Sequence, residues 1–131
     1  MQVNPSARAT DQPALAGILL GQARAHDALG MLCLRRGYDS SAHVQFLDSL
    51  RILEGLGDTQ HTPVVRMHLA QSRIGVALYQ EAEEILAETL AIFRERGDIV
   101  SQDEALRLLA TIQDERQRWF TKSNPDNRTT R

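Results

Sequence analysis

The sequence has almost no cysteine, and this scarcity limits where the protein can work. Cys33 is the only cysteine among 131 residues, so one chain cannot form a disulfide within itself or a cysteine-based metal cluster. The longest apolar run near the start, 14–20, is too short to span a bilayer, and residues 1–11 lack the charged-then-apolar order of a signal peptide. We therefore expect a cytoplasmic protein that does not enter a membrane.

The chain also lacks a surplus of positive charge. Its formal net charge is −2, whereas proteins dedicated to nucleic acid normally need a basic surplus for phosphate contacts. Lys122 is the only lysine, so arginine supplies almost all of the basic side chains. We expect no nucleic-acid partner.

Catalytic and cofactor motifs are missing as well. The four histidines, His26, His43, His61 and His68, form no HExxH motif and no metal-ligand spacing with a cysteine. No glycine-rich phosphate loop occurs, because the glycines fall at the ends or on the faces of expected helices. The sequence therefore predicts no enzymatic activity, no metal and no cofactor.

What the chain does contain is a segment written twice. Residues 49–58 read Ser-Leu-Arg-Ile-Leu-Glu-Gly-Leu-Gly-Asp, and 40 positions later residues 89–98 read Thr-Leu-Ala-Ile-Phe-Arg-Glu-Arg-Gly-Asp. Periods of 20–50 residues are typical of stacked supersecondary units that bury their apolar faces against their neighbours. The copy predicts a helical repeat protein without strands.

Apolar residues at helical spacing predict five helices. We expect them at about 12–36, at about 40–55, from Thr62 to about 76, from about 80 to 96, and at about 101–118. The helical domain as a whole spans 11–120, between a flexible lead at 1–10 and a disordered tail at 121–131.

Three of these helices carry capping signals at their first residues. Asp39 or Ser40 can cap the second helix, and Thr62 followed by proline is typical of an N-cap and first helical position. A hydroxyl at Ser101 with a carboxylate at Glu104 has the spacing of a capping box for the fifth helix. The turn at 77–80 lacks a glycine at the position that matches Gly37, so it is the least defined boundary.

With the 40-residue copy in register, the pattern resembles the tetratricopeptide family. The residues that carry the resemblance are Leu29-Gly30, Leu69-Ala70 and Leu109-Ala110 in the first helix of each unit, and Ala42, Ala82, Phe46 and Leu86 in the second. Small residues are needed where two helices cross closely, and a large residue four positions on fills the space behind the crossing. The resemblance implies an all-α, right-handed solenoid of antiparallel helix hairpins.

The unit length points to a subgroup of that family. At 40 residues it is longer than the standard 34, and the segment ending in Gly97-Asp98 resembles the longer repeats in sensor regions of large bacterial signalling regulators. Such regions bind peptides, proteins or small ligands. The resemblance therefore implies a non-catalytic interaction module, either an adaptor or a fragment of a regulator. Two alternatives stay open: a ligand- or signal-peptide-sensing domain, and an accessory subunit or chaperone of an enzyme or secretion system.

The family also implies where a partner would bind, namely in the concave groove lined by the first helix of each pair. Methionine offers an adaptable apolar contact and arginine a bidentate partner for carboxylates, so the groove would suit an extended acidic peptide or a partner helix. The positions carried over to this chain are Arg24, Asp27, Met31, Arg35, Met67, Gln71, Ile74, Arg107 and Thr111.

The first helix has more apolar residues than one packed face can hold, which predicts self-association. The stripe expected to pack on the second and third helices is Leu15, Ile18, Leu19, Gln22, Ala25, Leu29, Leu32 and Cys33. The apolar residues left on other faces are Ala14, Leu20, Ala28, Met31 and Leu34. A symmetric homodimer would cover them. The alternative is a further repeat of a longer array.

Overall fold

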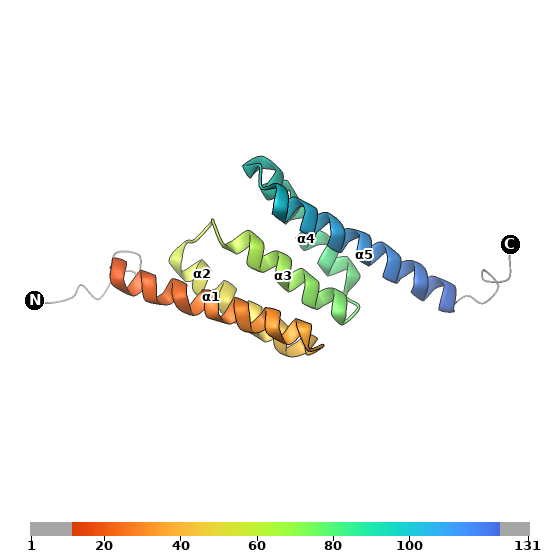
Figure 1. Ribbon diagram of the computed structural model, residues 1–131, viewed down its shortest axis with the longest axis horizontal. Coiled ribbons are helices and arrows are strands. Elements are labelled where there is room, and N and C mark those ends of the chain that lie inside the picture. Colours follow the sequence, from red (N-terminus) through yellow and green to blue (C-terminus); the bar gives the residue numbers. More distant parts are fainter. Residues whose placement is uncertain (1–11, 124–131) are drawn as a thin grey trace, which may run out of the picture.

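Five α-helices joined by short turns make up the computed structural model, which describes residues 12–123 (Figure 1). No strand occurs within that range, so the prediction of an all-α protein is confirmed. In chain order the helices are α1 (Pro13–Arg35), α2 (Asp39–Leu56), α3 (Thr62–Gly75), α4 (Tyr79–Arg96) and α5 (Ile99–Ser123).

The helix boundaries agree with the sequence prediction for the first four helices and differ for the fifth. α5 begins at Ile99 and continues through Ser123, so the first three residues of the predicted disordered tail are helical. The rest of that tail and the predicted flexible lead lie outside the described residues.

The 40-residue period recurs in the helix boundaries. α2 and α4 each have 18 residues, and both their first and last residues are 40 positions apart. The backbone turns match too: Gly57 and Gly97 have φ values of 67° and 68°, and Gly37 has a φ of 78°. Ala77, at the position that matches Gly37, adopts the same left-handed conformation with a φ of 64°. The second hairpin turn therefore forms without a glycine.

Aspartate side chains, rather than the predicted hydroxyls, accept the backbone N–H groups after the two Gly-Asp pairs: Asp98 caps α5, and Asp58 holds the turn before α3, whose N-cap residue His61 has no side-chain cap. Asp98 Oδ1 accepts a hydrogen bond from Ser101 N at 3.1 Å, and Asp58 Oδ1 accepts one from His61 N at 2.7 Å. The Thr62 hydroxyl instead donates to the Asp58 carbonyl at 2.7 Å. The predicted Ser101 and Thr62 caps are therefore wrong. A left-handed glycine ends the preceding helix in each case; Asp98 then stands directly before α5, whereas Asp58 stands four residues before the first residue of α3.

The second helix also starts differently from the prediction. Its N-cap residue is Tyr38, and no side chain donates or accepts a capping hydrogen bond there. Asp39 is already the first helical residue, where a carboxylate interacts favourably with the helix dipole instead of capping it.

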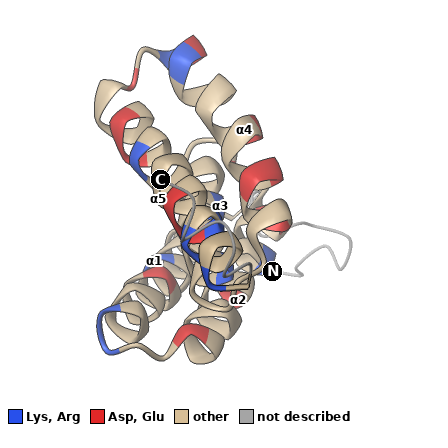
Figure 2. Ribbon diagram, turned by 90° about the vertical axis from the view of Figure 1, so that its right-hand side faces the viewer, with Lys and Arg blue, Asp and Glu red and all other residues tan. Residues whose placement is uncertain are grey.

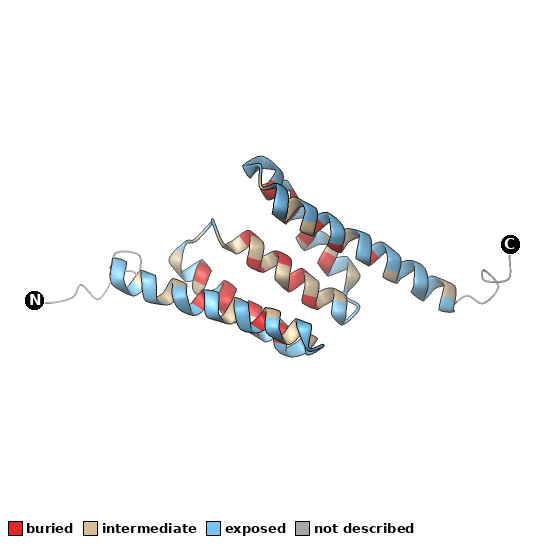
Figure 3. Cartoon of the chain, in the orientation of Figure 1, coloured by how far each residue is buried: buried red, intermediate tan, exposed pale blue. Residues whose placement is uncertain are grey.

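The helices form two layers. α1, α3 and α5 run side by side in the same direction, and α2 and α4 return behind them (Figure 1). Each helix contacts its neighbours along the chain, and α3 also contacts both α1 and α5. Buried residues lie along the inner sides of all five helices (Figure 3). One core cluster centred on Phe46 joins α1, α2 and α3, and a second centred on Phe93 joins α3, α4 and α5.

The face of α1 that packs on the rest of the protein is not the predicted one. Leu15, Ile18, Leu29 and Leu32 of the predicted stripe are 40%, 60%, 47% and 44% exposed. The inward-facing apolar residues are Leu20, Met31, Cys33 and Leu34, which pack against the first core cluster; of these, Cys33 belongs to the predicted stripe. Three residues predicted for self-association therefore pack inside their own chain: Leu20, Met31 and Leu34.

Two small residues of α1 explain this orientation. Ala23 and Gly30 are the buried residues of the helix, and the ring of Phe46 lies so close to Gly30 that a Cβ there would come within 2.3 Å of it. Small side chains let two helix backbones approach closely. The close approach of α2 thus decides which side of α1 turns inward.

A polar cluster joins α2, α3 and α4 at the end opposite the Gly-Asp turns. Arg73 Nη1 of α3 lies 2.8 Å from His43 Nδ1 of α2, and Arg73 Nε lies 3.6 Å from Glu81 Oε2 of α4. Because arginine only donates hydrogen bonds, His43 must be neutral to accept this one. Burial lowers the pKa of His43 below its usual value, the charge of Arg73 lowers it further, and Glu81 raises it in part.

We expect this cluster to make the protein less stable in mild acid. A histidine whose pKa is depressed on folding stabilises the fold fully above its unfolded pKa of about 6.5, and that contribution is lost as the pH falls through the folded pKa. In thermal melts between neutral and mildly acidic pH, the wild type should lose more melting temperature than His43→Gln. If the melting temperatures of the two proteins fall by the same amount over this pH range, the protonation of His43 does not destabilise the fold in this way.

Candidate partner-binding site

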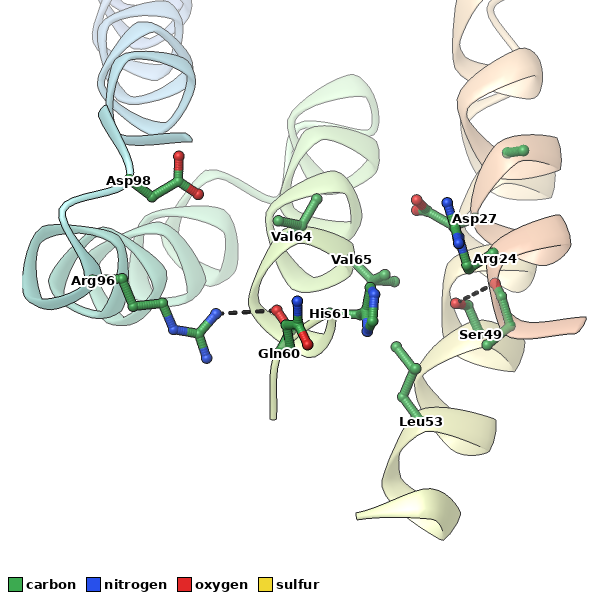
Figure 4. Close-up of a pocket in the computed structure, with 12 residues that line it drawn as sticks. Arg24, Asp27, Ser49, Leu53, Gln60, His61, Val64, Val65, Arg96 and Asp98 are labelled. Carbon is green, nitrogen blue, oxygen red and sulfur yellow. Dashed lines mark hydrogen bonds between the residues drawn. The ribbon is translucent and has the colours of Figure 1, made fainter. Parts of the chain in front are cut away.

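A cavity of about 550 Å³ opens between α1, α3 and the turn that joins α4 to α5 (Figure 4). Its apolar lining comes from the first core cluster and adjoining residues: Ala23, Ala28, Leu53, Val64 and Val65. The polar residues at its edge are Arg24, Asp27, Ser49, Gln60, His61, Arg96 and Asp98. An apolar lining with a few polar groups of both charges is the usual composition of a ligand site.

Local structure places these side chains in the cavity wall. Arg24, Asp27 and Ala28 are neighbours on one side of α1 because residues three and four apart in a helix share a face. Val64 and Val65 lie in the first turn of α3, directly after the loop that holds Gln60. Asp98 follows the left-handed Gly97. The 40-residue copy therefore supplies part of the wall through its Gly-Asp end.

The two aspartates at the cavity already have partners within the chain. Asp27 Oδ1 lies 2.7 Å from His68 Nδ1 of α3, which joins α1 to α3 across the layer. Asp98 holds the first turn of α5, and hydrogen bonds from the Ser101 hydroxyl and backbone N–H keep the pKa of Asp98 below its usual value. Both carboxylates are therefore occupied in positioning the helices.

His61 is occupied in a similar way. Its Nδ1 lies 2.9 Å from Asp58 Oδ2, and the Asp58 carboxylate also accepts the His61 backbone N–H. Burial raises the pKa of Asp58, but the hydrogen bonds and charge of His61 outweigh it, so the pKa lies below its usual value. The imidazole thus lines the cavity as part of a fixed turn.

Neither of the two arginines at the cavity forms an ion pair within the described residues, although the charge of Arg96 helps to lower the pKa of Asp98. Arg96 Nη1 donates to the Gln60 carbonyl at 3.0 Å, and Arg96 Nη2 donates to the Thr59 carbonyl. These acceptors are neutral, so they orient the guanidinium without removing its charge. Arg24 is exposed and forms no ion pair with any residue in the described range 12–123. A carboxylate of a partner is the group that this arrangement accommodates best.

Chemistry on a bound molecule has little support from the side chains around the cavity. The Ser49 hydroxyl donates to the Ala23 carbonyl at 2.7 Å and is buried, so it is used in joining α1 to α2. Among the described residues there is no group of three or more histidine, cysteine, aspartate or glutamate side chains that could hold a metal ion.

The predicted groove residues end up in different environments. Arg24 and Asp27 are together at the cavity. Met67 is only 3% exposed and belongs to the core, so a partner could not reach it. Met31 and Ile74 are half-buried against the two core clusters, and Gln71 is half-buried. The exposed residues that do not line the cavity are Arg35, Arg107 and Thr111.

Two of those exposed residues interact with their own helix. Arg107 Nη1 lies 3.3 Å from Glu104 Oε2, and the Thr111 hydroxyl donates to the Arg107 carbonyl at 3.0 Å. The α5 part of the predicted groove is thus a solvated helix face in this structure.

Sequence reasoning missed the loop and turn residues of the cavity. Gln60 and Arg96 come together only because Arg96 reaches back over 36 positions to the α2–α3 loop. The repetition of Gly-Asp after 40 residues is a signal for Asp98, because it places this side chain at a turn between two helices. His61 could have been found from its place three residues after Asp58.

A second hollow, of about 890 Å³, lies near the end of the chain. Its lining is more aromatic and consists of Ala77, Tyr79, Gln113, Arg116, Gln117, Trp119 and Phe120. Trp119 and Phe120 are 66% and 47% exposed. α5, the start of α4 and the turn before α4 form its wall, so it is an open surface hollow rather than a cleft between units.

Comparison with known protein families, curated proteins and solved structures finds no match to this chain. Within residues 12–123, none of the helices has both the length and the apolar character needed to cross a membrane. The interpretation of the site therefore depends on its own geometry.

Proposed function

We propose that the chain is a non-catalytic, protein- or peptide-binding module built from tetratricopeptide-like helix hairpins, and that it binds an acidic peptide segment at the cavity between α1 and α3. The observation that carries this proposal is the cavity itself: an apolar lining with two arginines, neither of which forms an ion pair with a residue in the described range, in the layer formed by the first helices. The helix boundaries at a spacing of 40 residues support the repeat architecture. The scarcity of cysteine supports a cytoplasmic setting.

The cavity favours a peptide with a particular pattern. Asp27 and Asp98 are held in place by His68 and Ser101, so neither carboxylate has to move when a peptide enters the cavity. Arg24 can pair with an aspartate or glutamate of the peptide, while the apolar lining takes a neighbouring aliphatic side chain. A charge-assisted pair next to a buried apolar anchor is the arrangement that dominates affinity in many interfaces.

Selection from a random peptide library on the purified protein tests the proposal. We expect the enriched peptides to contain an acidic residue beside an apolar one. Arg24→Glu should then weaken binding of a selected peptide by about tenfold or more, because it replaces attraction with repulsion. Arg51→Glu is the matched control: Arg51 is equally exposed on α2, where its Nη1 pairs with Asp48 Oδ1 at 3.0 Å, away from the cavity.

Filling the cavity gives an independent readout. Ala28→Trp places a large side chain at an exposed position of the cavity wall, so it should block the peptide without disturbing the core. Peptides that bind Arg24→Glu and Ala28→Trp as tightly as the wild type would show that partners bind elsewhere.

The size of the cavity also supports a second candidate function, the sensing of a small ligand. A volume of about 550 Å³ lies within the range of roughly 300–1,000 Å³ that is usual for small-molecule sites. A small organic acid that raises the melting temperature of the wild type, but not that of Ala28→Trp, would favour this function over peptide binding.

A further inference from the structure

One face of α1 carries exposed apolar side chains at the spacing of a coiled coil. Starting from Leu15, the steps along this face alternate between three and four residues, which is the spacing of the a and d positions of a heptad repeat. We call this face the α1 seam, and its residues are Leu15, Ile18, Gln22, Ala25, Leu29 and Leu32. Figure 3 shows much of α1 as exposed, and Figure 2 shows that it carries charge at only a few positions.

The same face is buried in the other helices of this layer. Val65, Leu69 and Ser72 of α3 occupy the positions 40 residues after Ala25, Leu29 and Leu32. They are 4%, 7% and 1% exposed, and Val65 and Leu69 pack in the cluster shared with α1 and α2. In α5 the corresponding residues begin with Ala105 and end with Ile112, both fully buried against α3 and α4.

The matching positions 40 and 80 residues later in the chain therefore indicate which kind of surface the α1 seam is suited to contact. In α3 and α5 this face packs on the helix pair that precedes it along the chain. For α1, no residue within the described range 12–123 covers the seam. The α1 seam thus has the apolar side chains of a face that is buried in α3 and α5, but in α1 these side chains are exposed.

Stacking of one copy onto the end of another does not suit this face. The part of α1 that receives α3 includes Ala23 and Asp27, and the positions 80 residues later on α5 are Asp103 and Arg107. Both are exposed. Head-to-tail stacking would bury these charges against leucine and isoleucine, which is costly without charge partners.

We infer that the α1 seam binds the α1 seam of a second copy of this chain, and that the two helices run antiparallel about a two-fold axis. This pairing matches an apolar seam with an identical one and buries no charge in its centre. Leu15 would face Leu32 of the partner subunit, and Ile18 would face Leu29 of the partner subunit. Each a position thus meets a d position of the partner helix, and every knob on this face is apolar except Gln22.

Charge selects the antiparallel direction. α1 carries Arg24 and Arg35, and Arg36 follows at its end; its one acidic residue, Asp27, pairs with His68 of its own chain. A parallel pair would place Arg36, which continues the seam spacing four residues after Leu32, beside its own counterpart, and like charges side by side are destabilising. The antiparallel pair puts Arg35 and Arg36 at opposite ends of the interface. None of the seam residues lines the cavity, so the dimer leaves that cavity open.

The oligomeric state of charge variants tests the inference. Sedimentation equilibrium should show a dimer for the wild type, and Ile18→Glu or Leu29→Glu should raise the dissociation constant by about 100-fold or more, because each buries an unpaired carboxylate. The matched control is Val100→Glu, since Val100 is 81% exposed on α5, away from the seam. Circular dichroism of each variant checks that the helices remain intact.

Cysteine cross-linking tests the direction, in proteins that also carry Cys33→Ser. Mixing Leu15→Cys with Leu32→Cys should give a disulfide-linked heterodimer on mild oxidation, since cross-linked Cβ atoms must come within about 4.5 Å. Leu15→Cys alone should stay uncross-linked. Efficient self-cross-linking of Leu15→Cys, with none in the mixture, would mean a parallel pair and would overturn the inference.

Two further results would also overturn it. One is a wild-type monomer at high concentration in which Leu29→Glu lowers the melting temperature, because the seam would then be covered by the same chain. The other is a dimer that tolerates both seam variants but dissociates when Trp119 and Phe120 are replaced by arginine. The interface would in that case be the aromatic hollow at the end of α5.

Discussion

Gly30→Ala is expected to destabilise the protein even though alanine is the better helix former. A Cβ at Gly30 would lie 2.3, 2.6 and 2.8 Å from three ring atoms of Phe46. That ring is fully buried in the first core cluster, so it has no room to move aside. Overpacking of this kind costs about 1–3 kcal/mol, which offsets or exceeds the gain of about 1 kcal/mol in helix propensity. Chemical denaturation of the two proteins measures the difference.

A matched glycine and a rescuing substitution make this prediction specific. Gly21 lies in the same helix with no atom within 4 Å of an added Cβ, so Gly21→Ala should stabilise by up to about 1 kcal/mol. The positions 40 residues after Gly30 and Phe46 hold Ala70 and Leu86, both fully buried. Adding Phe46→Leu to Gly30→Ala therefore reproduces the pair of the second unit.

We expect this double variant to be more stable than Gly30→Ala alone, because the smaller side chain removes the clash. Equal stabilisation by Gly30→Ala and Gly21→Ala would show that Phe46 does not press on Gly30 in solution.

The sequence contained enough information to predict the helices and their order. Apolar residues at helical spacing and glycines at helix ends are local signals. Because the chain repeats after 40 residues, each turn in one unit also supports the prediction of the matching turn in the other. The turn at Ala77 shows how the copy helps: nothing local favours a left-handed alanine there, yet the matching Gly37 indicated a turn.

The orientation of α1 could not be predicted from hydrophobicity alone. This helix has apolar residues on two sides, and counting them favoured the side that contains Leu29 and Leu32. The structure turns the other side inward because Gly30 and Ala23 allow α2 to come close. A close approach depends on the partner surface as well as on the helix, and Phe46 is 16 positions away from Gly30 in the sequence.

The site was partly predictable for a similar reason. Arg24 and Asp27 belong to one helix face, so the family resemblance could place them together. Arg96 and Gln60 meet through a loop whose course depends on how the units stack. Met67 illustrates the opposite error: its helical position suggested the groove, but the neighbouring α4 and α5 enclose it. The course of a loop and the burial of a side chain by neighbouring helices depend on tertiary packing, so local sequence patterns do not predict them.

Phe93→Ala is expected to cause the largest loss of stability among the variants described. Phe93 is fully buried at the centre of the second core cluster, where α3, α4 and α5 meet. Removing a buried aromatic ring costs about 3–5 kcal/mol, because the transfer free energy is lost and a cavity remains. Domains of this size have a total stability of only about 5–15 kcal/mol, so the variant should be marginally folded at best.

Two related variants show whether burial at this position is the cause. Phe120→Ala removes the same ring from a side chain that is 47% exposed, so it should cost less than about 1 kcal/mol. Phe93→Leu introduces the residue that the first unit has at the matching position, Leu53, which is also fully buried. We expect it to cost no more than about 1.5 kcal/mol.

Thermal and urea unfolding of these three variants therefore should rank Phe93→Ala far below Phe93→Leu, with Phe120→Ala near the wild type. A midpoint for Phe93→Ala that equals that of Phe120→Ala would contradict the contact between α4 and α5 at this point. Loss of α5 signal alone, with α1 to α3 still protected from hydrogen exchange, would instead agree with it, because each core cluster joins only three neighbouring helices.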